Sequence, residues 1–341
     1  MGSVKDLKII SPVVTDKMGI GRFHYSDRYS VFDWGEMPDL ITGKGKALCM
    51  IGAYFFEKLE EMGVATHYRG LVSNGNIVKL EDLDKPVDTM EIDLVRVLKP
   101  GIQGNTYNYS EYKDNASNFL IPLEIIYRNS LPEGSSIFRR LQEGNLSLEE
   151  IGLSRMPKPN DILSQPILDV STKLETTDRY LSWAEAQQIS GLADDELLEI
   201  KAVTGKINAL ITEQVSRAGL VNEDGKVEFA YDQNRKLILV DILGTPDECR
   251  FTYDTIPVSK EVARIHYRKT NWYKEVEIAK KKGGPQWKSS VSSLPPKLPD
   301  RLFEQISNLY MSTCNEITGK KWFSTQPLKN ILNELKEQLD N

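Results

Sequence analysis

A chain of 341 residues with 40% hydrophobic residues is long enough to bury a sizeable core and too apolar to be a disordered protein. Its net charge of −6 argues against nucleic acid as the main partner, because binding to a phosphate backbone needs a basic face. No signal-peptide pattern or bilayer-length apolar run occurs, so we expect no membrane partner. Three cysteines without metal-site spacing favour a reducing, cytoplasmic compartment.

The amino-terminal third predicts strands with one helix. Leu48, Ile51, Phe55 and Leu59 recur at helical spacing, so residues 47–62 should form a helix that packs on a sheet. Residues 99–118 are rich in Gly, Tyr and Asn and predict a loop or an insertion in the sheet, with a lid over a site as the functional alternative. Residues 143–161 predict a second polar insertion.

The middle of the chain contains a strand that leads into a candidate anion pocket. Residues 120–127 predict a buried strand, Arg128 follows it, and a turn with Gly134 and Ser135 comes soon after. Backbone amides, hydroxyls and a guanidinium would then share one small volume, which suits a phosphate or a carboxylate. A surface arginine beside an ordinary turn is the alternative interpretation.

Residues 224–241 predict a hairpin that carries charged groups. Alternation places Lys226 and Glu228 on one face of its first strand, and the second strand ends at Asp241. The hairpin should therefore bring Glu228 and Asp241 near each other. Two carboxylates beside a lysine suit Mg²⁺ with a nucleotide, because Mg²⁺ takes one or two carboxylates plus phosphate oxygens. A hairpin with a solvated charged face is the alternative.

The carboxy-terminal part predicts mostly helices. A long helix should begin near Asp194, where acidic residues suit a helix amino terminus, and end before Gly219. Residues 280–296 predict a flexible connection whose lysines are solvated rather than a nucleic-acid patch. Two helices should follow. The apolar face of the last one favours packing on its own domain over contact with a partner.

Several short motifs occur in the order and spacing of one enzyme family. They are SDRYSVFD at 26–33, TGKG at 42–45, PLE with Arg128 and GS at 122–135, STKLE with Asp178 at 171–178, DGKVEF at 224–229, Asp241 with TPD and Arg250, and Lys260 with Arg264. Through them, nearly the whole chain resembles phosphoribosylaminoimidazole-succinocarboxamide synthase, or SAICAR synthetase, of purine biosynthesis. The family's phosphate loop is abbreviated here at residues 15–21. Ile242 stands where the family has a further acidic residue.

The resemblance implies an α/β (α+β) fold with two lobes. Residues 1–122 would form a strand-rich, antiparallel-sheet lobe that covers the nucleotide. Residues 123–341 would form an ATP-grasp-like lobe that binds ATP, Mg²⁺ and the ribotide and ends in helices. The implied activity is that of an ATP-dependent ligase that condenses L-aspartate with carboxyaminoimidazole ribotide (CAIR) to SAICAR, ADP and phosphate through an acyl phosphate. A homo-oligomer is also compatible with the resemblance.

The resemblance also implies the residues of the site. The implied catalytic residues are Lys226, Lys173 and Asp178. The implied substrate-binding residues are Arg128, Ser135, Arg250, Lys260, Arg264 and Asp33. The implied nucleotide-binding residues are Lys17, Lys173, Lys226, Glu228 and Asp241, and the last two would also hold the metal.

Two other functions stay open on the sequence alone. An ATP-dependent phosphotransferase of kinase-like fold would share the lysines and the metal carboxylates, since a fold does not fix a function. It would have no need of two arginine-bearing turns for a second anionic substrate. A catalytically silent relative that only binds ligands would be compatible with Ile242 and the abbreviated first loop.

Overall fold

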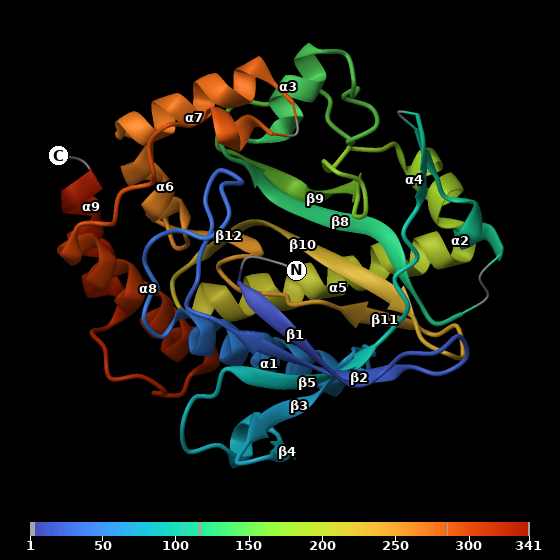
Figure 1. Ribbon diagram of the computed structural model, residues 1–341, viewed down its shortest axis with the longest axis horizontal. Helices are drawn as coiled ribbons and strands as arrows, with labels where there is room; N and C mark the ends of the chain where they lie inside the picture. The colour runs from blue at the N-terminus through green and yellow to red at the C-terminus, as the bar shows by residue number, and fades with distance from the viewer. Residues whose placement is uncertain (1–3, 105, 115–116, 285, 340–341) are drawn as a thin grey trace.

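The computed structural model describes residues 4–104, 106–114, 117–284 and 286–339. Two antiparallel sheets with surrounding helices give a mixed α/β architecture (Figure 1). The amino-terminal sheet has the strand order β1-β2-β5-β3-β4, and the larger sheet has the order β13-β12-β10-β8-β9 with β11 also paired to β10. The predicted fold class is confirmed.

The strands of the amino-terminal sheet are β1 (Lys5–Ser11), β2 (Gly19–Tyr25), β3 (Tyr68–Ser73), β4 (Asn76–Val78) and β5 (Thr89–Leu94). The strands of the larger sheet are β8 (Phe119–Leu131), β9 (Asp161–Thr172), β10 (Val221–Tyr231), β11 (Leu237–Val240), β12 (Cys249–Tyr253) and β13 (Ile256–Pro257). A separate hairpin joins β6 (Gly101–Gln103) to β7 (Thr106–Asn108).

The helices are α1 (Lys44–Glu61), α2 (Ser110–Asp114), α3 (Ser136–Gln142), α4 (Trp183–Ser190), α5 (Asp194–Arg217), α6 (Glu261–Arg268), α7 (Asn271–Lys282), α8 (Asp300–Thr318) and α9 (Leu328–Leu339), with short 3₁₀ turns at Leu80–Asp82 and Trp287–Ser290. Helix α1 packs on the amino-terminal sheet and α5 on the larger sheet, while α8 contacts both helices. These helices therefore link the two sheets.

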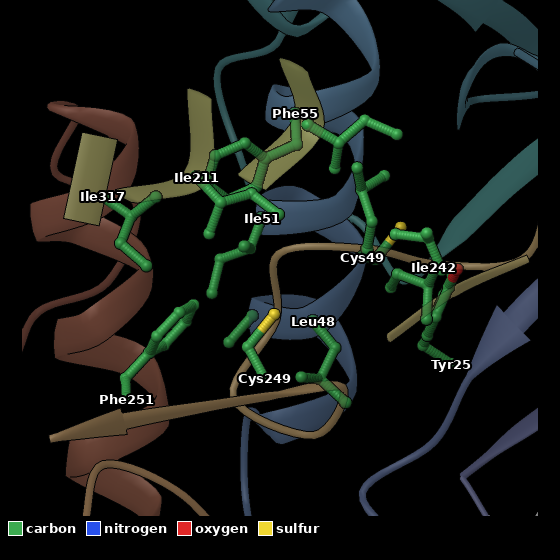
Figure 2. Close-up of a cluster of buried hydrophobic side chains, with 14 of the residues drawn as sticks. Tyr25, Leu48, Cys49, Ile51, Phe55, Ile211, Ile242, Cys249, Phe251 and Ile317 are labelled. Atoms are coloured by element: carbon green, nitrogen blue, oxygen red, sulfur yellow. The ribbon is translucent and has the colours of Figure 1, made fainter. Parts of the chain in front are cut away.

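One hydrophobic core runs between the sheets. Figure 2 shows side chains of α1, α5, α8 and β12 gathered in it, among them Ile51, Ile211 and Phe251. Each of these three is fully buried, and burial of one such side chain stabilises the fold by about 1.5–3 kcal/mol. Ile242 also lies in this core, since its side chain packs against the backbone of α1 at Gly52. A carboxylate at position 242 would therefore have to be buried.

The two long helices predicted from the sequence are confirmed, and their ends have clear causes. The carboxylate of Asp27 accepts hydrogen bonds from the amides of Gly43 and Gly45 at the start of α1, at 3.3 and 2.9 Å. At the start of α5, Glu196 accepts from the Ala193 amide at 2.9 Å. Gly219 adopts a φ of 75° just after α5, a conformation that glycine takes without steric cost.

The predicted connecting segments differ in detail. Residues 99–118 contain the β6–β7 hairpin and α2 instead of an irregular loop, with residues 105, 115 and 116 outside the described part. The predicted polar insertion at residues 143–161 consists of turns and irregular chain up to residue 160, and Asp161 begins β9. The connection at 280–296 includes the end of α7 and a 3₁₀ turn. The last helix, α9, packs on α8 with Ile331, Leu332 and Leu335 buried, which confirms that it covers its own domain.

The proposed lobe boundary at residue 122 falls inside β8, so a cut there would divide a strand that pairs with both β9 and β10. Within the described ranges, no helix has the length and apolar character that crossing a membrane requires. The cysteines Cys49, Cys249 and Cys314 are buried and unpaired.

Candidate active site

Strand alternation builds the site on one face of the larger sheet. Residues two apart on a strand share a face, so Glu124 and Arg128 lie on one side of β8, and Asp224, Lys226 and Glu228 lie on one side of β10. The register pairs Glu228 with Glu124 and Asp224 with Arg128. Two charged clusters therefore follow each other along the same pair of strands.

The first is a lysine–glutamate cluster of Glu124, Lys173, Lys226, Glu228 and Glu248. Lys173 Nζ lies 2.6 Å from Glu228 Oε1 and 3.1 Å from Glu124 Oε1. Lys226 Nζ lies 2.9 Å from Glu124 Oε1, 3.3 Å from Glu228 Oε1 and 3.4 Å from Glu248 Oε2. Burial lowers the pKa of Lys226, but the surrounding carboxylates outweigh it and raise that pKa above its usual value. Both lysines therefore stay charged beside three carboxylates.

Asp241 lies next to this cluster, at the end of β11. Val240 is the register partner of Glu228, so Asp241 is one residue beyond that partner, as the predicted hairpin requires. Its carboxylate forms an ion pair with Lys5 of β1. Burial lowers the pKa of Lys5 to about 8, although the charges of Glu248 and Glu228 act to raise it. Lys5 thus joins the amino-terminal sheet to the lysine–glutamate cluster.

The second group is an arginine–aspartate network of Arg128, Arg140, Asp169, Asp224 and Arg250. Arg128 Nη2 lies 3.0 Å from Asp169 Oδ2, and Arg128 Nη1 lies 3.5 Å from Asp224 Oδ2. Arg140 Nη1 reaches the same Asp169 oxygen at 2.6 Å, while Arg250 forms an ion pair with Asp224. The side chain of Arg128 is only 3% exposed, whereas that of Arg250 is 42% exposed. Arg250 is therefore the more accessible cation for an anionic ligand.

A cavity of about 1210 Å³ connects the two groups. Among its lining residues are six that the sequence predicted for the site, namely Arg128, Asp178, Lys226, Arg250, Lys260 and Arg264. Lys173 and Glu228 are not lining residues, but Lys173 bonds to Glu124 and Glu228 bonds to Lys226, and Glu124 and Lys226 both line the cavity. Burial and the nearby charge of Glu124 raise the pKa of Asp178 above its usual value.

Three other predicted residues are also not among those that line this cavity. Ser135 is buried and caps α3, accepting a hydrogen bond from the Ile137 amide at 3.4 Å, and it is the next residue, Ser136, that accepts from Arg128 at 3.2 Å. Lys17 is exposed in the β1–β2 turn, at the opposite end of β1 from Lys5. Asp33 is 88% exposed and pairs with Lys280 at 2.8 Å.

The structure adds Lys5, Glu124 and Glu248 to the residues predicted for the site. Glu124 and Glu248 lie within or beside the PLE and TPD motifs, so the strand alternation around Glu124 could have identified it. Lys5 has no local signal. Its place follows from the register that sets it opposite Tyr25, directly before the SDRYSVFD segment.

A buried ion pair anchors the turn that delivers Glu248 and Arg250. Lys44 Nζ, at the start of α1, lies 2.7 Å from Asp247 Oδ2, and the two side chains are 0% and 3% exposed. The Tyr310 hydroxyl donates to the other carboxylate oxygen at 2.7 Å. Burial alone would raise the pKa of Asp247, but the charges of Lys44 and Lys260 outweigh it and hold that pKa well below its usual range.

Glu228 and Asp241 are the predicted carboxylates that could hold a metal ion. Among the described residues, no group of three or more His, Cys, Asp or Glu side chains is arranged as a ready metal site. Glu228 and Asp241 each already hold a lysine ammonium, so cations are favoured at both oxygens. Mg²⁺ keeps waters and phosphate oxygens among its ligands and needs only one or two carboxylates.

A cavity with this charge pattern suits an enzyme that acts on phosphorylated, anionic substrates, and the comparisons with known proteins name the family. Residues 13–279 match SAICAR synthetase. The chain belongs to the SAICAR synthetase family, as the sequence motifs predicted. It is 52% identical over 340 residues to a protein of Archaeoglobus fulgidus described provisionally as a phosphoribosylaminoimidazole-succinocarboxamide synthase, and the match covers 100% of both chains.

Solved structures share the fold. A SAICAR synthase from Saccharomyces cerevisiae, solved in complex with SAICAR, is similar with a TM-score of 0.65 at 21% identity, covering 95% of each chain. A SAICAR synthetase in complex with ADP is similar with a TM-score of 0.54 at 21% identity, covering 87% of this chain and 99% of that one. At these identities the likeness supports the architecture described above.

Proposed function

We propose that this protein is an ATP-dependent ligase that condenses L-aspartate with CAIR to give SAICAR, ADP and phosphate in purine biosynthesis. The observation that carries the proposal is the cavity on the larger sheet, where the lysine–glutamate cluster and the arginine–aspartate network lie side by side in a chain of this family. One cluster suits phosphoryl transfer and the other suits a second anionic substrate. The unpaired, buried cysteines are in keeping with action in the cytoplasm.

The chemistry requires activation of a carboxylate, because a carboxylate repels nucleophiles and has a poor leaving group. A CAIR carboxylate oxygen attacks the ATP γ-phosphorus and ADP leaves. The aspartate amine then attacks the acyl carbon, phosphate leaves and one amine proton is lost. Lys226 and Lys173 would offset the negative charge that develops on the transferred phosphoryl group. Asp178 lies close to the same cavity end and would accept the amine proton.

The remaining site residues would bind the substrates. Glu228 and Asp241 would hold Mg²⁺, with Glu124 beside them, and the ion would supply positive charge that neutralises the phosphates. When the metal binds, Asp241 would leave its ion pair with Lys5. The Lys5 ammonium would then bind a nucleotide phosphate, which is the role that the sequence predicted for Lys17. Arg250 and Arg128 would hold the ribotide phosphate, and Lys260 and Arg264 would bind substrate carboxylates. Asp33, the exposed last residue of the SDRYSVFD segment, would bind the aspartate substrate.

The test is an assay of ADP release with defined mixtures of ATP, Mg²⁺, CAIR and L-aspartate, followed by mass spectrometry of the products. Strong ADP release should require all substrates together, and the succinocarboxamide should form in a one-to-one ratio with ADP. A phosphotransferase would instead leave a stable phosphorylated product that persists when aspartate is added. A silent relative would bind the ligands without turnover. Either of these outcomes would refute the ligase.

Substitution of Arg250 by lysine should weaken CAIR binding by about 1–2 kcal/mol, roughly five- to thirtyfold, and leave ATP affinity within about twofold. Lysine keeps the charge but loses the planar fork that binds two phosphate oxygens at once. Calorimetric titration of each ligand measures both affinities. Arg155→Lys is the matched control, because Arg155 is 69% exposed and outside the cavity lining. A loss confined to ATP binding would place Arg250 at the nucleotide instead.

A further inference from the structure

His67 makes three hydrogen bonds that join the two sheets beside Asp241. Its amide donates to the carbonyl of Leu239 in β11 at 2.9 Å, and its carbonyl accepts from the amide of Asp93 in β5 at 2.7 Å. The ring Nε2 lies 3.0 Å from the backbone carbonyl oxygen of Asp241. A carbonyl oxygen can only accept, so Nε2 is the donor. His67 thus bonds both to strand β11, which ends just before Asp241, and to Asp241 itself.

The ring is fixed in place by aromatic neighbours. The side chain of His67 is buried, and the ring centroids of Phe23 and Phe56 lie 5.9 and 5.5 Å from its own. Phe23 also lies under the ammonium of Lys5, at 4.6 Å from centroid to Nζ, and Lys5 is the ion-pair partner of Asp241. The His67 ring, which bonds to the Asp241 backbone, and the Lys5 ammonium, which pairs with the Asp241 carboxylate, therefore both pack against Phe23.

Asp241 needs such support. Its φ is 63°, in the left-handed region that residues other than glycine adopt only occasionally. This conformation comes directly after the end of β11 at Val240, and the Asp241 carboxylate pairs with Lys5. A hydrogen bond to the carbonyl of this residue opposes its return to an extended conformation, in which the carboxylate would point elsewhere.

We infer that His67 is a positioning residue for the metal carboxylate of Asp241, acting through the backbone carbonyl and not as an acid, base or ligand. The inference rests on the proposed function, because it takes Asp241 as a Mg²⁺ ligand. Loss of an outer partner of a metal ligand lowers metal affinity 10–100-fold in known sites. His67→Leu should therefore weaken divalent-cation binding about tenfold, while His67→Gln, whose amide can reach the same carbonyl, should stay within about threefold of the wild type.

The experiment measures binding of Mn²⁺ in the presence of ADP by electron paramagnetic resonance, together with the Mg²⁺ concentration for half-maximal ADP release. Both should shift about tenfold in His67→Leu, with the KM for L-aspartate within twofold. His24→Leu is the matched control on strand β2, because the His24 ring is exposed and lies beside Thr89 and Asp88. It should change none of these quantities.

Wild-type Mn²⁺ affinity in His67→Leu would overturn the inference, and so would an equal loss in a folded His67→Gln. If His67→Leu does not fold, His67→Asn replaces it, since its shorter amide cannot reach the carbonyl, and the same tenfold loss is expected. A wild-type protein without any divalent-cation dependence would instead refute the proposed metal site, and with it the assignment of His67.

Discussion

Replacement of Glu228 by glutamine is expected to lower turnover at least about a hundredfold. The substitution keeps the shape of the side chain but removes the charge that holds Lys173 and Lys226 and that would hold Mg²⁺. Charged and polar groups that are already positioned around the reacting atoms, away from bulk water, usually make the largest contribution to such catalysis. Removal of one of these groups typically lowers turnover about a hundred- to a thousandfold. Steady-state ADP release across a range of Mg²⁺ concentrations measures the effect.

The control for this variant is Glu91→Gln. Glu91 is also a buried carboxylate with two cationic partners, Arg22 and Arg69, but it lies in the amino-terminal sheet outside the cavity. Its turnover should stay within about twofold of the wild type. Thermal melts of both variants separate loss of chemistry from loss of folding. A folded Glu228→Gln enzyme with normal turnover and an unchanged Mg²⁺ requirement would contradict the assignment.

Replacement of Lys44 by methionine should lower the free energy of unfolding by about 3–5 kcal/mol, because it leaves the Asp247 carboxylate buried without its cation. Methionine fills much of the same volume, so the effect reports charge rather than a cavity. Urea unfolding at pH 7 measures it. Addition of Asp247→Asn to the same chain should recover part of the loss, since no buried charge is then left unpaired.

The pair also has a defined acid dependence. The pKa of Asp247 is lowered in the folded protein, so its contribution to stability is present above the unfolded pKa of about 3.9 and is lost as the pH falls below it. The free energy of unfolding should therefore decrease below about pH 4 in the wild type, with a smaller slope in Asp247→Asn. Equal slopes in the two proteins would contradict a lowered pKa.

The elements that follow from local periodicity were predictable. The stripe in α1, the acidic start of α5 and the alternation around Lys226 each depend on residues a few positions apart, and the structure confirms them. The family was predictable for a related reason, because several short motifs occurred in one order. These patterns identify the strands that carry the site, although no single motif shows how the charges on them pair.

The pairing of charges was not predictable, because it depends on contacts far apart in the sequence. Arg128 was expected to be open to a ligand, yet Asp169, 41 residues away, already binds it. Lys5 and Asp241 are 236 residues apart, and only the register of β1 against β2 brings Lys5 to the site in place of Lys17. A search for a phosphate-binding lysine within one turn could not have found it.

Residues 65–67 have a consequence for how the protein can be divided. The Ala65 carbonyl accepts a hydrogen bond from the amide of Leu239 in β11, and Thr66 forms a parallel bridge to the same residue. The His67 carbonyl accepts a hydrogen bond from the amide of Asp93 in β5. The two sheets therefore share backbone hydrogen bonds as well as side chains. A cut between the sheets would remove these backbone hydrogen bonds and the ion pair between Lys5 and Asp241, so the two halves are unsuited to separate expression.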